Sequence, residues 1–150
     1  MPFIRVTTPA HLLSDDQRSR VADRLTVAIM KIETGGHDTP GFRAISALVF
    51  DDVPTQRWAI GGVLGDEPAA VVEIRVPQGA LDDDRRRQMA EVSYEVLSEA
   101  SPELAGVDGV RRIWTHLVEI AEGNWGAGGR IARLDDIRQV ATGATLAAVG

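Results

Sequence analysis

The fold is decided by two stretches of the sequence, DVPTQRWAIGG at residues 52–62 and EIAEGNWGAGG at residues 119–129. In both stretches an acidic residue and a β-branched residue are followed by a tryptophan and then by two glycines. Each of these positions in the second stretch lies 67 residues after its counterpart in the first. So many matches at one offset indicate that one unit is written twice, with a glycine-turned hairpin in each copy.

Strands are predicted around both hairpins. In the first copy, residues 3–7 and 43–51 are rich in β-branched and aromatic side chains, and residues 58–62 form a short returning strand that ends in the glycine turn. In the second copy, residues 70–76 and 110–120 have the same character. Each pair of strands flanks a helical pattern, so each copy is predicted to be a β-α-β unit with a hairpin.

One amphipathic helix is predicted in each copy. Ser14 and Gln17 have the spacing of a capping box, Gly35-Gly36 ends the first helix, and Asp82 begins the second. An offset of 68 relates the two helical stripes, whose members are Val21, Leu25, Ile29 and Ile32 in the first copy and Met89, Ser93, Leu97 and Ala100 in the second.

These elements predict an α+β fold. Two tandem β-α-β units, at about residues 2–64 and 69–131, form a four-stranded sheet with two helices on one face plus short hairpin strands. The chain is then a single domain with a short C-terminal tail at residues 132–150. Within the tail, residues 134–140 favour a short helix, and the apolar residues 144–149 are either frayed or docked on a neighbour.

Composition excludes several classes of function. The chain has 150 residues, a net charge of -6 and no cysteine, which argues against a nucleic-acid partner and excludes thiolate chemistry. Its three histidines have no metal-ligand spacing, so no metal site is expected. We find neither a leader-like N-terminus nor an apolar run long enough to span a membrane, and a cytoplasmic protein is the default expectation.

Three features together resemble the tautomerase superfamily, whose prototype is 4-oxalocrotonate tautomerase. They are Pro2 at the start of the first strand, the helix start at residues 14–17, and the second hairpin at residues 119–129, which is similar to the prototype's hairpin. The resemblance covers roughly residues 2–130 and is closest to the fused members, in which one chain holds two units. It implies a homotrimer with no metal or organic cofactor and a small-molecule substrate that bears a carboxylate.

The resemblance also implies that Pro2, freed by removal of Met1, is the catalytic group. A free α-amino group has a pKa of about 7.7–8.0, and an apolar pocket lowers it further, which suits a general base near neutral pH. In relatives that hydrate or dehalogenate, the same group stays protonated and acts as an acid. The alternative is that Pro2 has no catalytic role; with Met1 retained, its nitrogen is an amide and no base.

The substrate-binding residues of the prototype carry over only in part. Trp125 resembles the aromatic wall of the pocket, although both it and Trp58 are also explained by packing of the hairpins, which is the favoured reading for Trp58. The prototype's two carboxylate-binding arginines have no basic counterpart here, since the matching positions are Leu13, Leu81, Ala47 and Trp114. That departure speaks against the prototype's dicarboxylate substrate.

Other side chains are candidates for binding the substrate. Arg75 lies in the strand expected beside the first one, and His116 shares a sheet face with Trp114. Three further arginines, Arg43, Arg111 and Arg112, lie near strand starts. The competing reading for each arginine is an ordinary ion pair, and for His116 a hydrogen-bonded sheet residue. The acids at residues 51–52 and 82–84 match turns and a helix start rather than a reactive site.

Three functions therefore compete. The first is keto-enol tautomerisation of a small 2-oxo or enol acid by Pro2, and the second is a hydratase, dehalogenase or decarboxylase that uses the same proline as an acid. The third is a non-catalytic, ferredoxin-like binding module. Only the first copy starts at a potentially free nitrogen, whereas the second starts inside the chain near Ala70. We therefore expect one active site per chain, to which the second copy contributes Trp125, with Arg75 or His116 as further candidates.

Overall fold

A computed structural model describes residues 1–106 and 109–141 of the chain. Four strands form the main sheet, in the order β2-β1-β5-β6. Their bounds are Phe3–Pro9 for β1, Ala47–Val53 for β2, Ala70–Pro77 for β5 and Ile113–Ile120 for β6. The outer pairs, β1 with β2 and β5 with β6, are parallel, and the central pair of β1 and β5 is antiparallel. The predicted α+β fold of two joined β-α-β units is confirmed.

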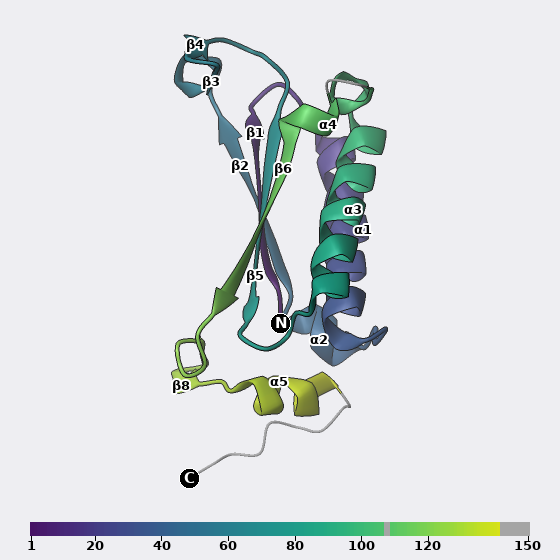
Figure 1. The fold of residues 1–150 in the computed structure, drawn as a ribbon, viewed down its shortest axis with the longest axis vertical. Coiled ribbons are helices and arrows are strands. Elements are labelled where there is room, and N and C mark those ends of the chain that lie inside the picture. The colour runs from purple at the N-terminus through teal and green to yellow at the C-terminus, as the bar shows by residue number, and fades with distance from the viewer. Residues whose placement is uncertain (107–108, 142–150) are drawn as a thin grey trace.

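Two long helices, α1 (Asp15–Thr34) and α3 (Asp83–Ala100), cover one face of this sheet (Figure 1). The Ser14 side chain accepts a hydrogen bond from the Gln17 backbone N–H, and the Gln17 side-chain oxygen accepts one from the Ser14 backbone N–H, so the capping box is confirmed. Gly35 ends α1 at a φ of 75°, which glycine adopts without strain. The Asp82 side chain accepts from the Arg85 N–H at the start of α3.

The main core lies between the helices and the sheet. Alternate residues of the central strands point into it, and the helices supply the predicted stripes. Fully buried members include Ile4, Val6, Val72, Ile74, Leu25, Ile29, Met89 and Leu97. The one polar stripe position, Ser93, is also buried, and its hydroxyl donates to the Met89 carbonyl oxygen at 2.7 Å. Burial of this apolar area is the largest stabilising contribution to the fold.

Each unit ends in a small hairpin that stands apart from the main sheet. The first holds the 3₁₀ turn η1 (Thr55–Arg57) and strands β3 (Ala59–Ile60) and β4 (Val63–Leu64). The second holds β7 (Gly126–Ala127) and β8 (Arg130–Ile131). The two hairpins lie at opposite ends of the sheet (Figure 1). The predicted strand at residues 58–62 is therefore shorter than expected, because the two glycines form the turn itself, at φ angles of 61° and 83°.

Two predicted strands begin later than expected. Residues 43–44 belong to a short helix, α2 (Pro40–Ala44), because Thr39 caps it, Pro40 fits its first turn and Phe42 is buried in a second core. Residues 109–112 form α4 (Gly109–Arg112), and β6 starts only at Ile113, where its partner β5 starts at Ala70. Another 3₁₀ turn, η2 (Pro102–Leu104), follows α3.

The C-terminal tail begins with the predicted short helix, α5 (Leu134–Ala141). It lies beyond the second hairpin, at the end of the sheet where the N-terminus is found (Figure 1). The apolar stretch at residues 144–149 lies outside the described residues.

Candidate functional site

The topology brings the N-terminus, the second hairpin and α5 to one end of the sheet. The first residue of β1, Phe3, pairs with Arg75 near the end of β5, and Arg75 pairs with Val118 near the end of β6. Because β1 runs antiparallel to β5 and β6, the start of β1 lies where those strands finish. Pro2 is buried at this end, and its carbonyl oxygen accepts a hydrogen bond from the Ala47 N–H at 3.1 Å.

A buried ion pair holds the N-terminal amino group. The Met1 amine donates to the Glu33 carboxylate oxygen Oε2 at 2.7 Å, and the two side chains are only 10% and 4% exposed. Desolvation lowers the pKa of the Met1 amine, with a smaller opposing effect from the charge of Glu33. Desolvation likewise raises the pKa of Glu33, opposed by the nearby ammonium group. Burial thus pushes both groups toward their neutral forms.

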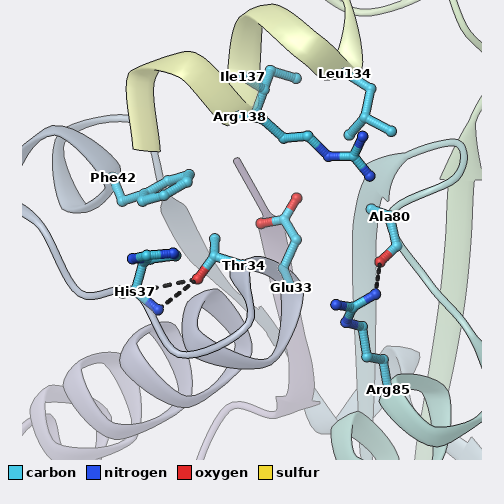
Figure 2. A pocket seen from close by; sticks show the side chains of 9 residues that line it. All are labelled: Glu33, Thr34, His37, Phe42, Ala80, Arg85, Leu134, Ile137 and Arg138. Carbon is cyan, nitrogen blue, oxygen red and sulfur yellow. Dashed lines mark hydrogen bonds between the residues drawn. The ribbon is translucent and has the colours of Figure 1, made fainter. Parts of the chain in front are cut away.

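The same carboxylate borders a cavity of about 230 Å³, which we call the Glu33 cavity. Figure 2 shows Glu33 projecting into it, with Phe42 on one side and Ala80 on the other. Helix α5 closes the cavity from above with Leu134 and Ile137. The lining thus combines an apolar wall with one buried carboxylate.

Two arginines complete the lining of the Glu33 cavity. Arg85, from the first turn of α3, donates to the Asp82 carboxylate at 3.3 Å. Arg138, from α5, pairs with Asp135 at 3.3 Å. Both guanidinium groups remain partly exposed, and neither is paired with Glu33 by any described contact. They give the cavity two cationic groups with donors still free for a small anion.

An apolar cluster surrounds the Met1 side chain. Met1 is 8% exposed and packs with Met30, Phe42 and Ile137, and Trp125 of the second hairpin packs against this cluster from outside. The sequence analysis placed no residue of α5 in the site, yet Ile137 and Arg138 both line it.

A second, more open cavity of about 340 Å³ lies at the same end and is called the Trp125 cavity. Phe3, Arg75 and Trp125 line it, with Ile120, Asn124 and Gly126. The Arg75 guanidinium pairs with Glu73 at 2.7 Å and lies 5.9 Å from the centre of the Phe3 ring. The structure thus brings together two predicted site residues, Arg75 and Trp125, next to the residue that follows Pro2.

The other predicted site residues lie elsewhere. Trp114 and His116 are exposed on the sheet face that the helices leave open, and neither lines the two cavities described above. Arg43 pairs with Asp38, and Arg112 pairs with Glu67, as the ion-pair reading expected. Trp58 is buried, and its indole N–H donates to the Glu67 carbonyl oxygen at 3.0 Å, so it packs the first hairpin.

Sequence reasoning assigned no site role to the residues that line the Glu33 cavity, including its three charged ones, Glu33, Arg85 and Arg138. One signal for Glu33 was available. It occupies the last turn of α1, where the helix dipole is negative and an acid is unfavourable. A residue that breaks a local rule often marks a functional site. Nothing in the sequence indicates that α5 and α3 bring their arginines to the same place.

Residues 1–106 and 109–141 contain no group of three or more His, Asp or Glu side chains placed to hold a metal ion. No helix in this part of the chain is both long enough and apolar enough to cross a bilayer.

Comparison with solved structures identifies the fold. A protein inactivated by 2-oxo-3-pentynoate superimposes with a TM-score of 0.69 at 14% identity, covering 87% of this chain and 94% of its own. A fused 4-OT, solved as an asymmetric trimer, gives 0.69 at 16% identity, with coverages of 87% and 95%. A member of the cis-3-chloroacrylic acid dehalogenase family gives 0.65 at 17% identity, with coverages of 86% and 82%.

No protein-family model and no curated protein matches the sequence. The likeness is therefore one of fold: the chain is similar over most of its length to proteins described as fused 4-OT.

Proposed function

Starting from this fused tautomerase fold, we propose that the chain is a tautomerase-like enzyme. Its general base is the secondary amine of Pro2, exposed once Met1 is removed, and its substrate is a small 2-oxo or enol acid. The observation that carries the proposal is the buried N-terminal amine, which lies against Glu33 at the edge of a cavity in that fold.

The environment suits a base. Desolvation is the larger influence on the terminal amine, and it lowers the pKa and increases the neutral fraction at physiological pH. A Pro2 amine at this place meets the same apolar surroundings. The hydrogen bond between its carbonyl oxygen and Ala47, at 3.1 Å, fixes the backbone, and the proline ring fixes the direction of the nitrogen lone pair. The amine takes a proton from the carbon beside a carbonyl and returns one to another atom of the conjugated system.

Met1 marks the space that the substrate uses. Its side chain fills a position between Met30, Phe42 and Ile137, next to the nitrogen of Pro2. Removal of Met1 leaves this apolar space vacant, and the vacant space adjoins the nitrogen of Pro2. An unsaturated carbon chain fits such a lining because dispersion and hydrophobic contacts are non-directional.

The carboxylate of the substrate needs a cationic partner other than the prototype's arginines. Arg85 and Arg138 reach one side of the site through the Glu33 cavity, and Arg75 reaches the other beside Trp125. A guanidinium binds a carboxylate through two parallel hydrogen bonds, so either arrangement supports recognition of a monocarboxylate. Trp125 supplies an apolar wall at the boundary of both regions.

A homotrimer is part of the proposal. One face of the main sheet lacks a helical cover among the described residues, and Val49 and Trp114 are exposed on it. The similar fused proteins include trimers. Light scattering on the purified protein tests this, with a mass three times that of the chain expected.

The test of the catalytic role combines mass and turnover. Intact-mass measurement of the purified protein should show that Met1 is absent. Treatment with 2-oxo-3-pentynoate, whose activated alkyne accepts amines, should add one molecule per chain at Pro2 and abolish ketonisation of phenylenolpyruvate. Full turnover after complete labelling contradicts the proposal.

A second candidate reaction uses the same amine as an acid. The charge of Glu33 raises the pKa of the adjacent amine and so opposes the effect of burial. If the charge of Glu33 raises the pKa of the Pro2 amine more than it raises that of the Met1 amine, Pro2 stays protonated. It then acts as the acid of a hydratase, dehalogenase or decarboxylase whose substrate is an unsaturated or 3-oxo acid. A panel of 3-haloacrylates, acetylenic acids and 3-oxo acids decides between the two reactions.

A further inference from the structure

The two oxygens of the Glu33 carboxylate have different surroundings. Oε2 accepts the hydrogen bond of the terminal amine at 2.7 Å. Oε1 is buried and has no hydrogen-bond partner among the described residues. A buried carboxylate oxygen without a partner is costly, commonly by about 1–3 kcal/mol, so its retention calls for an explanation. Figure 2 shows this carboxylate directed into the Glu33 cavity, where a bound molecule would meet it.

The groups that face Glu33 come from every element around it. They are the terminal amine before β1, His37 from the loop after α1, Arg85 from α3 and Arg138 from α5. Only the amine is bonded to Glu33, since Arg85 and Arg138 pair with their own neighbouring aspartates. Among the described residues, Glu33 is thus bound to one partner, and its second oxygen is buried without one.

The amine and the carboxylate share one proton more evenly than in water. Desolvation shifts the pKa of each toward its neutral form, which brings the neutral pair closer in free energy to the ion pair. Coupled groups of this kind titrate as a unit, with macroscopic pKa values that belong to the pair. A carboxylic acid and an amine in contact are the two partners that a concerted proton shift needs.

We infer that Glu33 is a second catalytic residue, which donates its proton through Oε1 to the carbonyl oxygen of the substrate. This inference rests on the proposed function of Pro2. The backbone nitrogens of Met1 and Pro2 are joined by three covalent bonds and lie about 3 Å apart. Rotation of the flexible Glu33 side chain covers this distance after Met1 is removed.

The step balances within the site. The neutral Pro2 nitrogen takes a proton from the carbon beside the carbonyl, and the electron pair of that C–H bond forms the carbon–carbon double bond. The carbonyl oxygen takes the proton of Glu33 and becomes the hydroxyl of the enol. The Pro2 ammonium then returns a proton to the Glu33 carboxylate across their hydrogen bond. The reverse sequence converts enol to ketone, and no other reactant is consumed.

The decisive variant is Glu33→Gln, which keeps the size and hydrogen-bonding capacity of the side chain but cannot exchange a proton. We expect kcat for phenylenolpyruvate to fall about 100-fold, as for the loss of one acid-base group. Wild type should show a bell-shaped dependence of kcat on pH, because only the pair holding one proton is active. Ketonisation of this enol needs the Pro2 ammonium to protonate the carbon and the Glu33 carboxylate to take the hydroxyl proton. In Glu33→Gln the acidic limb should therefore disappear, leaving a plateau that falls at alkaline pH.

Labelling by 2-oxo-3-pentynoate separates this inference from the proposed function. The Pro2 amine of Glu33→Gln should still be labelled at a rate within about threefold of wild type after correction for its altered pKa. The matched control is Glu99→Gln, which removes an exposed ion pair with Arg24. It should keep the activity and the bell-shaped profile.

Two results would overturn the role of Glu33: wild-type kcat in Glu33→Gln, or an unchanged acidic limb. If wild type itself is neither labelled nor active, the proposed function fails instead. If circular dichroism shows that Glu33→Gln is unfolded, Glu33→Asp tests the role of Glu33 instead. This variant keeps the acid but withdraws it by one methylene, so its kcat should fall at least tenfold with the bell shape intact, and an unchanged kcat would refute the role.

Discussion

The two ends of the sheet carry hairpins of matching sequence, yet only one end has the features of a site. At the first end, Trp58 is 9% exposed and its indole is bonded to the backbone of Glu67. There the chain passes without interruption through buried Ala69 into β5. At the second end, Trp125 is half-buried and borders an open cavity beside the start of the chain. The repeated unit therefore forms the scaffold twice, and the N-terminal amine of Met1 lies at the second end.

The two ends also differ in their buried ionisable groups. Glu33, in the last turn of α1, is buried against the terminal amine. The helical offset of 68 puts Ser101 at the corresponding place after α3, and that residue is buried but cannot ionise. Of these two corresponding positions, the ionisable one is the one that lies against an amine. Four changes, taken from the largest expected effect to the smallest, test this difference.

Blocking the terminus should have the largest effect. A short extension that precedes Pro2 and resists removal turns its nitrogen into an amide, which has no basic lone pair. We expect kcat/KM for phenylenolpyruvate to fall by at least about 100-fold, the usual contribution of a general base. The same extension placed after Gly150 is the control and should leave kcat/KM unchanged. An active N-terminally blocked protein would mean that the two ends do not differ in this chemistry.

The two tryptophans should respond in opposite ways to truncation. Trp58→Ala should lower the free energy of unfolding by about 3–5 kcal/mol, because a buried ring and its hydrogen bond are lost. Trp125→Ala should cost less than half as much stability but raise KM, because its ring borders a cavity. Urea unfolding and steady-state kinetics measure the two effects. Equal losses of stability would show that both hairpins serve packing alone.

The buried acid predicts a pH dependence confined to the second end. Burial raises the pKa of Glu33 from its ordinary 4.5, so the folded chain holds this proton more tightly than the unfolded chain does. Its favourable contribution is complete below pH 4.5 and is lost as the pH rises through the folded pKa. The stability of wild type relative to Glu33→Gln should therefore decrease over this range, by at most about 1.4 kcal/mol per pH unit. Urea unfolding at a series of pH values measures it, and Ser101→Ala should show no such trend.

Removing the N-cap side chain of either long helix should have the smallest effect, and the loss of stability should be the same for both helices. Ser14 and Asp82 are related by the same offset of 68, and each accepts a hydrogen bond from the backbone N–H three residues on. Ser14→Ala and Asp82→Ala should each reduce the free energy of unfolding by about 1 kcal/mol. Thermal unfolding measures both. A much greater loss for one of them would show that the two halves do not share stability evenly.

Local features of the fold could be predicted from the sequence. The capping box at Ser14, the end of α1 at Gly35 and the buried stripes of both helices each depend on residues a few positions apart. Residues 43–44 were assigned to a strand because their apolar neighbours favour one. The helix forms there because Phe42 is buried in a cluster with Met30 and Ile137, from distant parts of the chain. No window of sequence contains that contact.

The candidate site divides in the same way. The sequence indicated Pro2, Trp125 and Arg75, and the structure places them at one end of the sheet. It gave no reason to join Glu33 to the terminal amine or to bring Arg85 and Arg138 to one cavity. Those contacts arise from the antiparallel pairing of β1 with β5 and from the position of α5.

The sequence by itself determined the duplicated unit and the elements of each copy. These follow from periodicity, caps and turns, which act over a few residues of one chain segment. Only the tertiary structure decided which end of the sheet encloses the terminal amine of Met1, and that its partner is a buried carboxylate. Desolvation and the 2.7 Å contact with Glu33 depend on groups that meet only after the chain has folded.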